Sequence, residues 1–261
     1  MKYRYYVADA FTDCLFGGNP AGICLLDRWL DESVMQNVAA ENNLAETAFL
    51  VPAGGEYELR WFTPEVEIDL CGHATLASAF ILANFTENPP ETMVFHTKSG
   101  ALTVTRRGPD YEMDFPSRPP EPVPVQPAMG QALGAPVLEA HQSRDLLLLL
   151  ESEQQVRDLK PDLARLASIA GAFAYIVTAR GDEVDFVSRF FAPNAGIPED
   201  PVTGSSHSTL IPFWARRLGR TEMKARQLSK RGGELGVRDC GERVRISGRA
   251  RLYLEGFISV E

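Results

Sequence analysis

The sequence predicts an α+β protein of two related domains, each a mostly antiparallel, barrel-like sheet around one central helix. The first observation is a long internal repeat, which indicates one domain made twice rather than a short solenoid unit. The second is a helix, 74–83, that is apolar on nearly every side and must therefore be surrounded by protein. The third is a stiff connector, 116–127, that contains six prolines. The repeated segments are 47–51, 60–64, 72–73 and 100–104 in the first copy, and 173–177, 189–193, 204–205 and 233–237 in the second.

The first copy has short β-type runs separated by turn residues. Val34 and Val38 lie one turn apart and predict a helix over 31–42. Hairpins are expected where Gly54-Gly55 and Gly108-Pro109 interrupt the strand pattern. The predicted strands are 2–8, 21–26, 46–51, 56–62, 92–97, 101–106 and 110–115.

The second copy repeats this order after the proline-rich connector. Its predicted helices are 161–169 and 205–218, and Pro212 must kink or break the latter. Its predicted strands are 173–178, 184–191, 235–238 and 243–247. The predicted domains are therefore 1–118 and 119–249. Residues 250–261 have no counterpart in the first copy and are a candidate to complete the first domain's sheet.

Bulk properties exclude several classes of protein. The chain has 261 residues, 44% of them hydrophobic, and a formal net charge of -9, which argues against a nucleic-acid partner. No apolar run approaches the ~20 residues of a membrane span, and the start does not resemble a signal peptide. Four cysteines without C-x-x-C spacing indicate reduced thiols, so a cytoplasmic protein is expected.

Each copy places a glycine at the start of its apolar helix, Gly72 in the first and Gly204 in the second. The unpaired amides of a helix start carry partial positive charge and hold carboxylates well. Ligand sites favour domain interfaces. If the copies face each other across a cleft, the predicted ligand is a small acidic metabolite. Alone, each glycine would be read as a residue that permits a tight turn.

The copies differ at three titratable positions. Superposed by the repeat offsets, Glu46 falls on Ala172 and His73 falls on Ser205, while Asp200 lies in an insertion of the second copy. Two carboxylates and an imidazole in a partly dry cleft are suited to proton transfer. Each residue alone also has an ordinary structural role, as a solvated acid, a helix cap or a turn residue.

Other chemistries lack support in the sequence. The four histidines have no i,i+4 pair and lie apart from cysteine clusters, so no metal site and no cofactor are expected. No P-loop or dinucleotide fingerprint occurs. Cys71 at a helix start is a candidate thiolate, but Thr203 is its counterpart in the other copy, which excludes a two-thiol mechanism.

At these residues the chain resembles the phenazine biosynthesis PhzF-like family. The matching motifs follow one another along nearly the whole chain. They are Asp9-Ala10-Phe11-Thr12, Gly18-Asn19-Pro20-Ala21-Gly22-Ile23, Asn43-Leu44-Ala45-Glu46-Thr47-Ala48-Phe49, Asp69-Leu70-Cys71-Gly72-His73-Ala74-Thr75, Glu199-Asp200-Pro201-Val202-Thr203-Gly204-Ser205-Ser206-His207 and Arg231-Gly232-Gly233. Ala45 and Ser208 stand where many members have Ser and Cys.

The resemblance implies a diaminopimelate epimerase-like fold and a cofactor-independent isomerase that forms a homodimer. It implies that Glu46 is the acid/base that moves a proton between carbons of a small hydroxy- or amino-carboxylic acid. By the same match His73 and Asp200 assist catalysis, and the substrate is bound by Asn19, Gly72, His73, Gly204 and Ser205. The characterised family member acts in phenazine biosynthesis.

Two other functions stay open at this point. One is an amino-acid racemase or epimerase of the diaminopimelate type, which needs paired thiols where this chain offers only Cys71. The other is a metabolite-binding protein without catalysis, which would bind an acidic ligand and exchange no proton with it.

Overall fold

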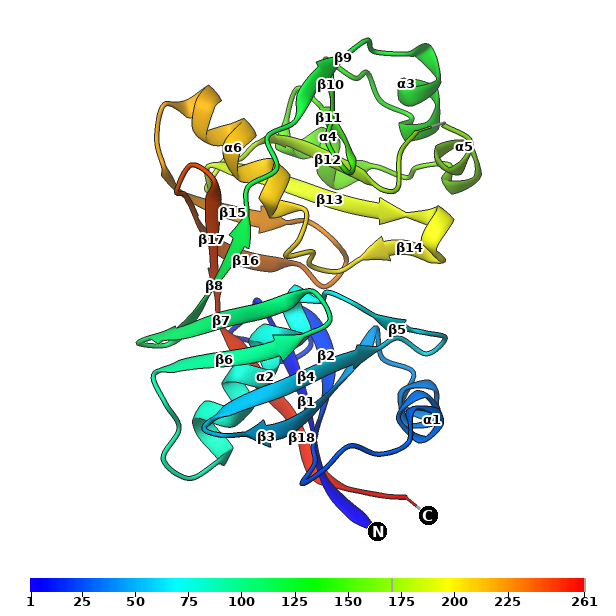
Figure 1. The fold of residues 1–261 in the computed structure, drawn as a ribbon. Helices are drawn as coiled ribbons and strands as arrows, with labels where there is room; N and C mark the ends of the chain where they lie inside the picture. The colour runs from blue at the N-terminus through cyan, green and yellow to red at the C-terminus, as the bar shows by residue number, and fades with distance from the viewer. Residues whose placement is uncertain (170, 261) are drawn as a thin grey trace. The chain divides into compact units, whose positions relative to one another are not determined.

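The computed structural model describes residues 1–169 and 171–260 and divides the chain into two compact units (Figure 1). The first unit comprises Met1–Asp114 and Ser247–Glu261, and the second comprises Phe115–Ile246. The returning segment expected over 250–261 belongs to the first unit, although its last residue, Glu261, lies outside the described residues.

Both units combine strands with few helices, as the predicted α+β class requires. The elements of the first unit are β1 (Lys2–Ala10), β2 (Asn19–Leu25), α1 (Glu32–Asn42), β3 (Glu46–Ala53), β4 (Glu56–Phe62), β5 (Glu67–Ile68), α2 (Gly72–Phe85), β6 (Thr92–Thr97), β7 (Gly100–Arg107), β8 (Asp110–Pro116) and β18 (Ala250–Ser259). Those of the second are β9 (Glu121–Val123), α3 (Pro127–Leu133), β10 (Glu139–Gln142), β11 (Leu146–Leu149), α4 (Glu153–Asp158), α5 (Leu163–Ala167), β12 (Tyr175–Arg180), β13 (Phe186–Ala192), the 3-10 turn η1 (Pro193–Ala195), β14 (Ile197–Asp200), α6 (His207–Leu218), β15 (Glu222–Gln227), β16 (Gly233–Asp239) and β17 (Arg243–Gly248).

Strand pairing confirms that the two units are copies of one design. In the first unit, β1–β2 and β3–β4 are antiparallel, β2–β3 and β4–β6 are parallel, and β6–β7 is antiparallel. In the second, β10–β11 and β12–β13 are antiparallel, β11–β12 and β13–β15 are parallel, and β15–β16 is antiparallel. The sheets are therefore mixed, because each copy contains two parallel pairs among its antiparallel ones.

The strand register corrects one detail of the sequence alignment. Thr47 pairs with Phe62 in the first unit, and Tyr175 pairs with Phe191 in the second. Since Phe62 and Phe191 are equivalent, Glu46 corresponds to Ala174 and not to Ala172. The error is two residues, which keeps every side chain on the same face of the strand and so leaves the apolar pattern intact. Glu46 still has no acidic counterpart.

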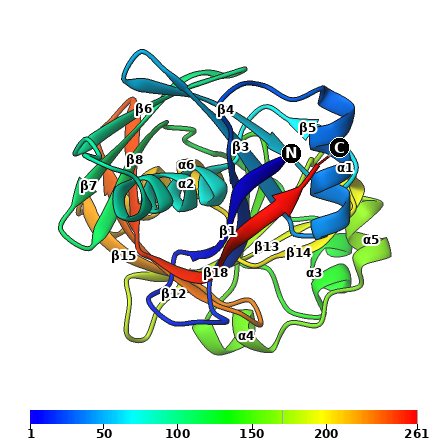
Figure 2. The same cartoon turned by 90° about the horizontal axis from the view of Figure 1, so that it is seen from below.

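Helix α2 is the central helix of the first unit. Every residue from Gly72 to Ala79 is buried, and the helix contacts β1, β2, β3, β7 and β18. Figure 2 shows β1, β3, β7 and β18 around it. A helix that is apolar on every side is stable only when protein surrounds it, and these strands surround α2.

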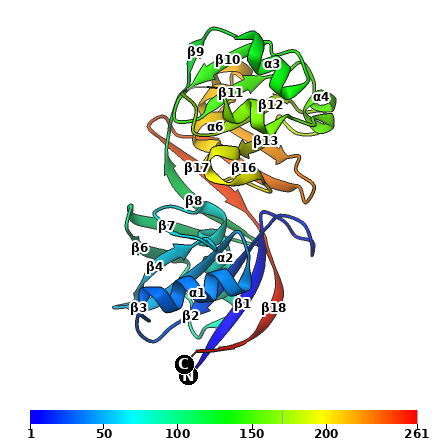
Figure 3. The same ribbon diagram turned by 90° about the vertical axis from the view of Figure 1, so that its right-hand side faces the viewer.

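The last strand closes the first unit. Strand β18 pairs antiparallel with β1 from Lys2 to Ala10, with one register shift after Val7. The two chain ends lie together (Figure 3), and Val260 N donates to Met1 O at 2.9 Å. The strands nearest the two ends of the sequence thus pair with each other within the first unit.

Pro212 lies inside α6 without ending it. A proline has no N–H, so the carbonyl of Ser208, four residues earlier, lacks its helical partner. Arg118 N from the proline-rich connector donates to this carbonyl at 2.9 Å. The connector therefore supplies the hydrogen bond that the helix cannot make itself.

Several elements differ from the sequence-based expectation. The helix expected over 161–169 is short, Leu163–Ala167, and begins after Asp162, whose side chain caps Arg165 N. The chain also forms α3, β10, β11 and β15, which the sequence pattern did not indicate. Strand β11 is a run of four leucines, all buried, so it lacks the polar/apolar alternation by which a strand is recognised. None of the described helices is long and apolar enough to cross a membrane.

Candidate functional site

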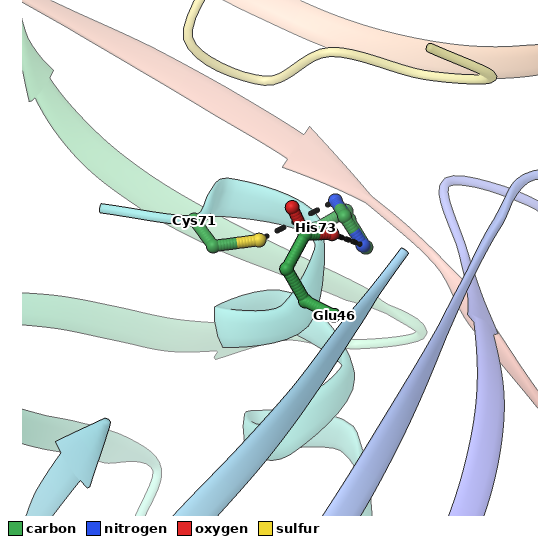
Figure 4. Close-up of side chains that lie close together, drawn as sticks. All are labelled: Glu46, Cys71 and His73. Carbon is green, nitrogen blue, oxygen red and sulfur yellow. Dashed lines mark hydrogen bonds and ion pairs between the residues drawn. The ribbon is translucent and has the colours of Figure 1, made fainter. Parts of the chain in front are cut away.

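Four side chains of the first unit converge, and we call them the acid–imidazole cluster: Asn19, Glu46, Cys71 and His73. Glu46 Oε2 lies 3.0 Å from His73 Nε2, and Cys71 Sγ lies 3.5 Å from His73 Nδ1 (Figure 4). Asn19 Nδ2 lies 3.2 Å from the same Nδ1. Both ring nitrogens of His73 therefore face polar groups of the cluster.

Local structure explains why these residues meet. Asn19 is the first residue of β2 and follows Gly18, whose φ of +61° favours glycine and where a Cβ would lie 2.1 Å from Ala10 O. Glu46 is the first residue of β3, which runs parallel to β2 with Ala21 opposite Glu46. Parallel strands that start side by side bring the two side chains to one end of the sheet.

The start of α2 supplies the other two members. Cys71 is the N-cap residue, but its side chain makes no capping hydrogen bond, and the first turn carries no acidic residue. The first helical amides carry partial positive charge, and no acidic side chain of the first turn neutralises it. Gly72 adds no side chain there, so the backbone can approach a ligand closely. This helix start can hold an anion beside His73.

Because the cluster is buried, neighbouring charges have a strong effect on the pKa values of its side chains. His73 is 5% exposed, and the Glu46 side chain is 12% exposed. Burial alone would lower the pKa of His73, but Cys71 and Glu46 outweigh it and raise that pKa well above its usual value. The 3.0 Å contact between Glu46 Oε2 and His73 Nε2 is an ion pair between two largely buried side chains.

Cys71 is a neutral thiol in this setting. Burial raises its pKa, and the neighbouring Glu46 carboxylate raises it further. A thiol with a raised pKa is a poor base at neutral pH. Its sulfur lies 3.5 Å from His73 Nδ1, and a charged ring can donate to it there.

In the second unit, the Asp200 loop (residues 200–206) joins β14 to α6. Asp200 accepts a hydrogen bond from Thr203 Oγ1 through its Oδ2. Gly204 is buried, and Ser205 is half-buried. Ser208 N donates to Ser205 O, and His207 N donates to Gly204 O, so 204–206 form a tight turn. The regular helix therefore begins at His207 and not near 205 as expected, because this turn has i→i+3 bonds.

Gln227 holds this loop and was not identified from the sequence. Its side chain is completely buried. Nε2 donates to Asp200 O at 2.7 Å, and Oε1 accepts from Thr203 N at 2.9 Å. Ser229 Oγ donates to Pro201 O at 2.8 Å. A glutamine 27 residues from Asp200 carries no sequence signal for this role, since only the parallel pairing of β13 and β15 brings it there.

His207, the other buried histidine, differs from His73. Burial lowers its pKa to about 4, against a smaller opposing effect of Thr203 O. Its Nδ1 lies 2.8 Å from Thr203 O. This ring is neutral at physiological pH and packs beside Phe186. Its contacts are those of a structural residue.

The predicted site residues thus form two groups. The structure brings together Asn19, Glu46, Gly72 and His73 in the first unit, and Asp200, Gly204 and Ser205 in the second. It adds Cys71 to the first group. Glu46, Cys71 and His73 offer oxygen, sulfur and nitrogen donors within 4.8 Å of one another, so this part of the described chain could hold a metal ion. The sequence did not indicate this because Cys71-x-His73 is not a usual zinc spacing.

Comparisons with known proteins give consistent results. A family model described as phenazine biosynthesis-like protein (PhzC-PhzF) matches residues 8–256. An uncharacterized isomerase of Pseudomonas aeruginosa is 47% identical, and the alignment covers 98% of each chain. A crystal structure of a PhzF family protein from Enterococcus faecalis superposes with a TM-score of 0.98 at 49% identity, over 100% of both chains.

A more distant match concerns the fold alone. A hydroxyproline epimerase from Agrobacterium vitis superposes with a TM-score of 0.60 at 9% identity, over 98% of this chain and 92% of that one. The expected epimerase-like fold is thereby confirmed.

Proposed function

The chain belongs to the phenazine biosynthesis-like (PhzC-PhzF) family of isomerases, and from this premise we propose that it moves a proton between carbons of a small hydroxy- or amino-carboxylic acid. The reaction needs no cofactor in this proposal, because a positioned carboxylate can both take and return a proton. The proposal does not extend to phenazines as the product.

The observation that carries the proposal is the Glu46–His73 pair. Glu46 Oε2 and His73 Nε2 lie 3.0 Å apart in a buried setting, where charges interact more strongly than in water. Glu46 takes the proton from one carbon and returns it to another. His73, kept charged by its neighbours, stabilises the negative charge that develops on the substrate. A carboxylate is suited to accept a proton, and a charged imidazole is suited to stabilise a developing negative charge.

In this proposal the Asp200 loop has a substrate-binding role, as the family resemblance implies. Asp200 accepts a hydrogen bond from a hydroxyl or amino group, and the amides near Gly204 and Ser205 are suited to a carboxylate. Support comes from the fixed loop, in which Gln227 holds Asp200 O and Thr203 N. A loop held in this way pays little entropy on binding.

A single base favours a double-bond shift over racemisation. Inversion at a stereocentre usually requires a second base on the opposite face. Among the described residues beside Glu46 and His73, Cys71 is the candidate, and burial raises the pKa of its thiol. Thr203 offers a hydroxyl where the diaminopimelate mechanism would need a second thiol. The epimerase alternative is therefore less well supported.

The experiment is a ligand screen followed by isotope exchange. Small hydroxy- and amino-carboxylates are screened by thermal shift, and hits are incubated with the enzyme in D2O and followed by proton NMR. We expect deuterium to enter a carbon position while the double bond moves. Deuterium at a stereocentre that requires Cys71 but not Glu46 would indicate an epimerase, and tight binding without any exchange would indicate a binding protein.

We also propose that the protein is a homodimer, as the family resemblance implies. Light scattering coupled to size-exclusion chromatography tests this directly. A mass of twice 28.8 kDa is expected, and a mass of 28.8 kDa would contradict the proposal.

A further inference from the structure

The acid–imidazole cluster contains the donor types that thiophilic divalent cations prefer. Cys71 offers sulfur, His73 nitrogen and Glu46 oxygen, all within 4.8 Å of one another. Zinc sites combine these three donor types, and a site with three protein ligands leaves one position for water or a substrate atom. The same cluster could therefore hold a proton-transfer pair or an ion, but not both at once.

The distance between the first two donors fits tetrahedral coordination. Cys71 Sγ and His73 Nδ1 are 3.5 Å apart. Zinc lies about 2.3 Å from sulfur and about 2.05 Å from nitrogen, so an ion bridging this pair would subtend an angle of about 107°. This is close to the tetrahedral value, and neither side chain has to move far to reach it.

The third donor and the surroundings complete the site. Glu46 Oε2 lies 3.0 Å from His73 Nε2, the other ring nitrogen, and within 4.8 Å of the donor atoms of the cluster, so its carboxylate must turn from Nε2 toward an ion at Nδ1. The ion would displace the 3.2 Å contact between Asn19 Nδ2 and His73 Nδ1. Burial of Cys71 and His73 removes competing water and strengthens the electrostatic attraction.

We propose that Glu46, Cys71 and His73 bind a thiophilic divalent cation of the Zn²⁺ class, and that the bound ion inhibits the enzyme. Binding rests on the geometry alone, whereas inhibition also rests on the proposed function, because the ion occupies both Glu46 and His73. The Cys71 thiol loses its proton on binding, as does His73 Nδ1 when the ring is charged. These protons go to the buffer, so affinity increases with pH.

Co²⁺ is a suitable probe because its spectrum reports both coordination geometry and thiolate ligation. The titration uses a Cys14→Ser/Cys240→Ser background, which removes the two exposed thiols. We expect one equivalent of Co²⁺ to give thiolate charge-transfer bands and tetrahedral d–d bands, both lost on addition of Zn²⁺. Adding Cys71→Ser or His73→Gln should remove these bands, with folding checked by circular dichroism.

The outcomes separate this inference from the proposed function. Absence of the bands in the background variant, or their persistence after Cys71→Ser, would overturn the cation site. If the ion binds and proton exchange on an identified substrate stops, and a chelator restores it, inhibition is supported. If the ion binds and exchange continues, the inhibitory role is wrong while the site stands.

Discussion

Glu46 and His73 are ionisable side chains held in a largely dry part of the first unit. Their 3.0 Å contact links their protonation states, and His73 also contacts Cys71 and Asn19. His207, also buried, has the backbone carbonyl of Thr203 and the Ser206 hydroxyl as its polar neighbours among the described residues. The two histidines therefore differ because of their partners, not because of their burial.

We expect the pKa values of these two histidines to move in opposite directions from about 6.5. Nitrogen-detected NMR should show His73 still protonated well above that pH, and His207 neutral down to about 4. In Glu46→Gln the pKa of His73 should fall, since an opposing charge is removed. A His73 ring that titrates at or below 6.5 in the wild type would contradict the assignment.

These shifts also predict how stability depends on pH. The raised pKa of His73 stabilises the folded state below pH about 6.5, and this contribution is lost as pH rises through the raised value. The lowered pKa of His207 acts in the other sense, so stability falls as pH drops from about 6.5 through about 4. Denaturant unfolding of the wild type and of Glu46→Gln across pH 5–9 measures the first effect, which should shrink in the variant.

At the scale of elements, strand starts and helix starts position the chemistry. Strands β2 and β3 begin side by side with Asn19 and Glu46, and α2 begins with Gly72 and His73. In the second unit, β15 ends at Gln227, which holds the Asp200 loop. A side chain at the end of one strand thus fixes a loop that connects two other elements.

Gln227→Leu should destabilise the protein by about 1–3 kcal/mol, because it removes the hydrogen bonds that the buried Gln227 amide makes with Asp200 O and Thr203 N. Urea unfolding measures this loss, and hydrogen exchange should increase at residues 200–206. Gln154→Leu is the matched control, since Gln154 is exposed and its side chain donates to Asp158 on its own helix. Equal effects of the two substitutions would refute the role of Gln227.

For the whole molecule, the chain returns to close its first unit. Strand β18 pairs with β1 along nine residues, and Phe11 N donates to Arg249 O at 2.7 Å. These contacts join residues more than 230 positions apart in the sequence. Pairing at this sequence separation closes a long loop, which slows folding, and it is needed for the sheet to be complete.

Deleting residues 250–261 should therefore prevent cooperative folding of the first unit. The deletion removes all partners of β1 on that side and exposes an open sheet edge. We expect loss of soluble protein or rapid proteolysis within residues 1–114. The control deletes only residues 260–261, which retains every β1–β18 pair; a stable full-length-like core in the longer deletion would contradict the prediction.

The sequence was informative where a pattern is local and repeated. The internal repeat predicted two related units, and the apolar helix 74–83 predicted an enclosed α2. Strand β11 was missed because its leucines do not alternate with polar residues. Gln227 was missed as a partner of the site because pairing between distant strands, not spacing along the chain, brings it there. Cys71 was identified as a candidate thiolate, but the burial that raises the pKa of its thiol could not be predicted from spacing along the chain.

The most direct test of the account is the rate at which solvent deuterium enters an identified substrate in Glu46→Gln. Removing the acid/base should slow exchange at least about 100-fold while the variant still binds the substrate. Glu65→Gln, an exposed glutamate of the same unit, should exchange at the wild-type rate. Exchange in Glu46→Gln within a few-fold of wild type would show that another group moves the proton.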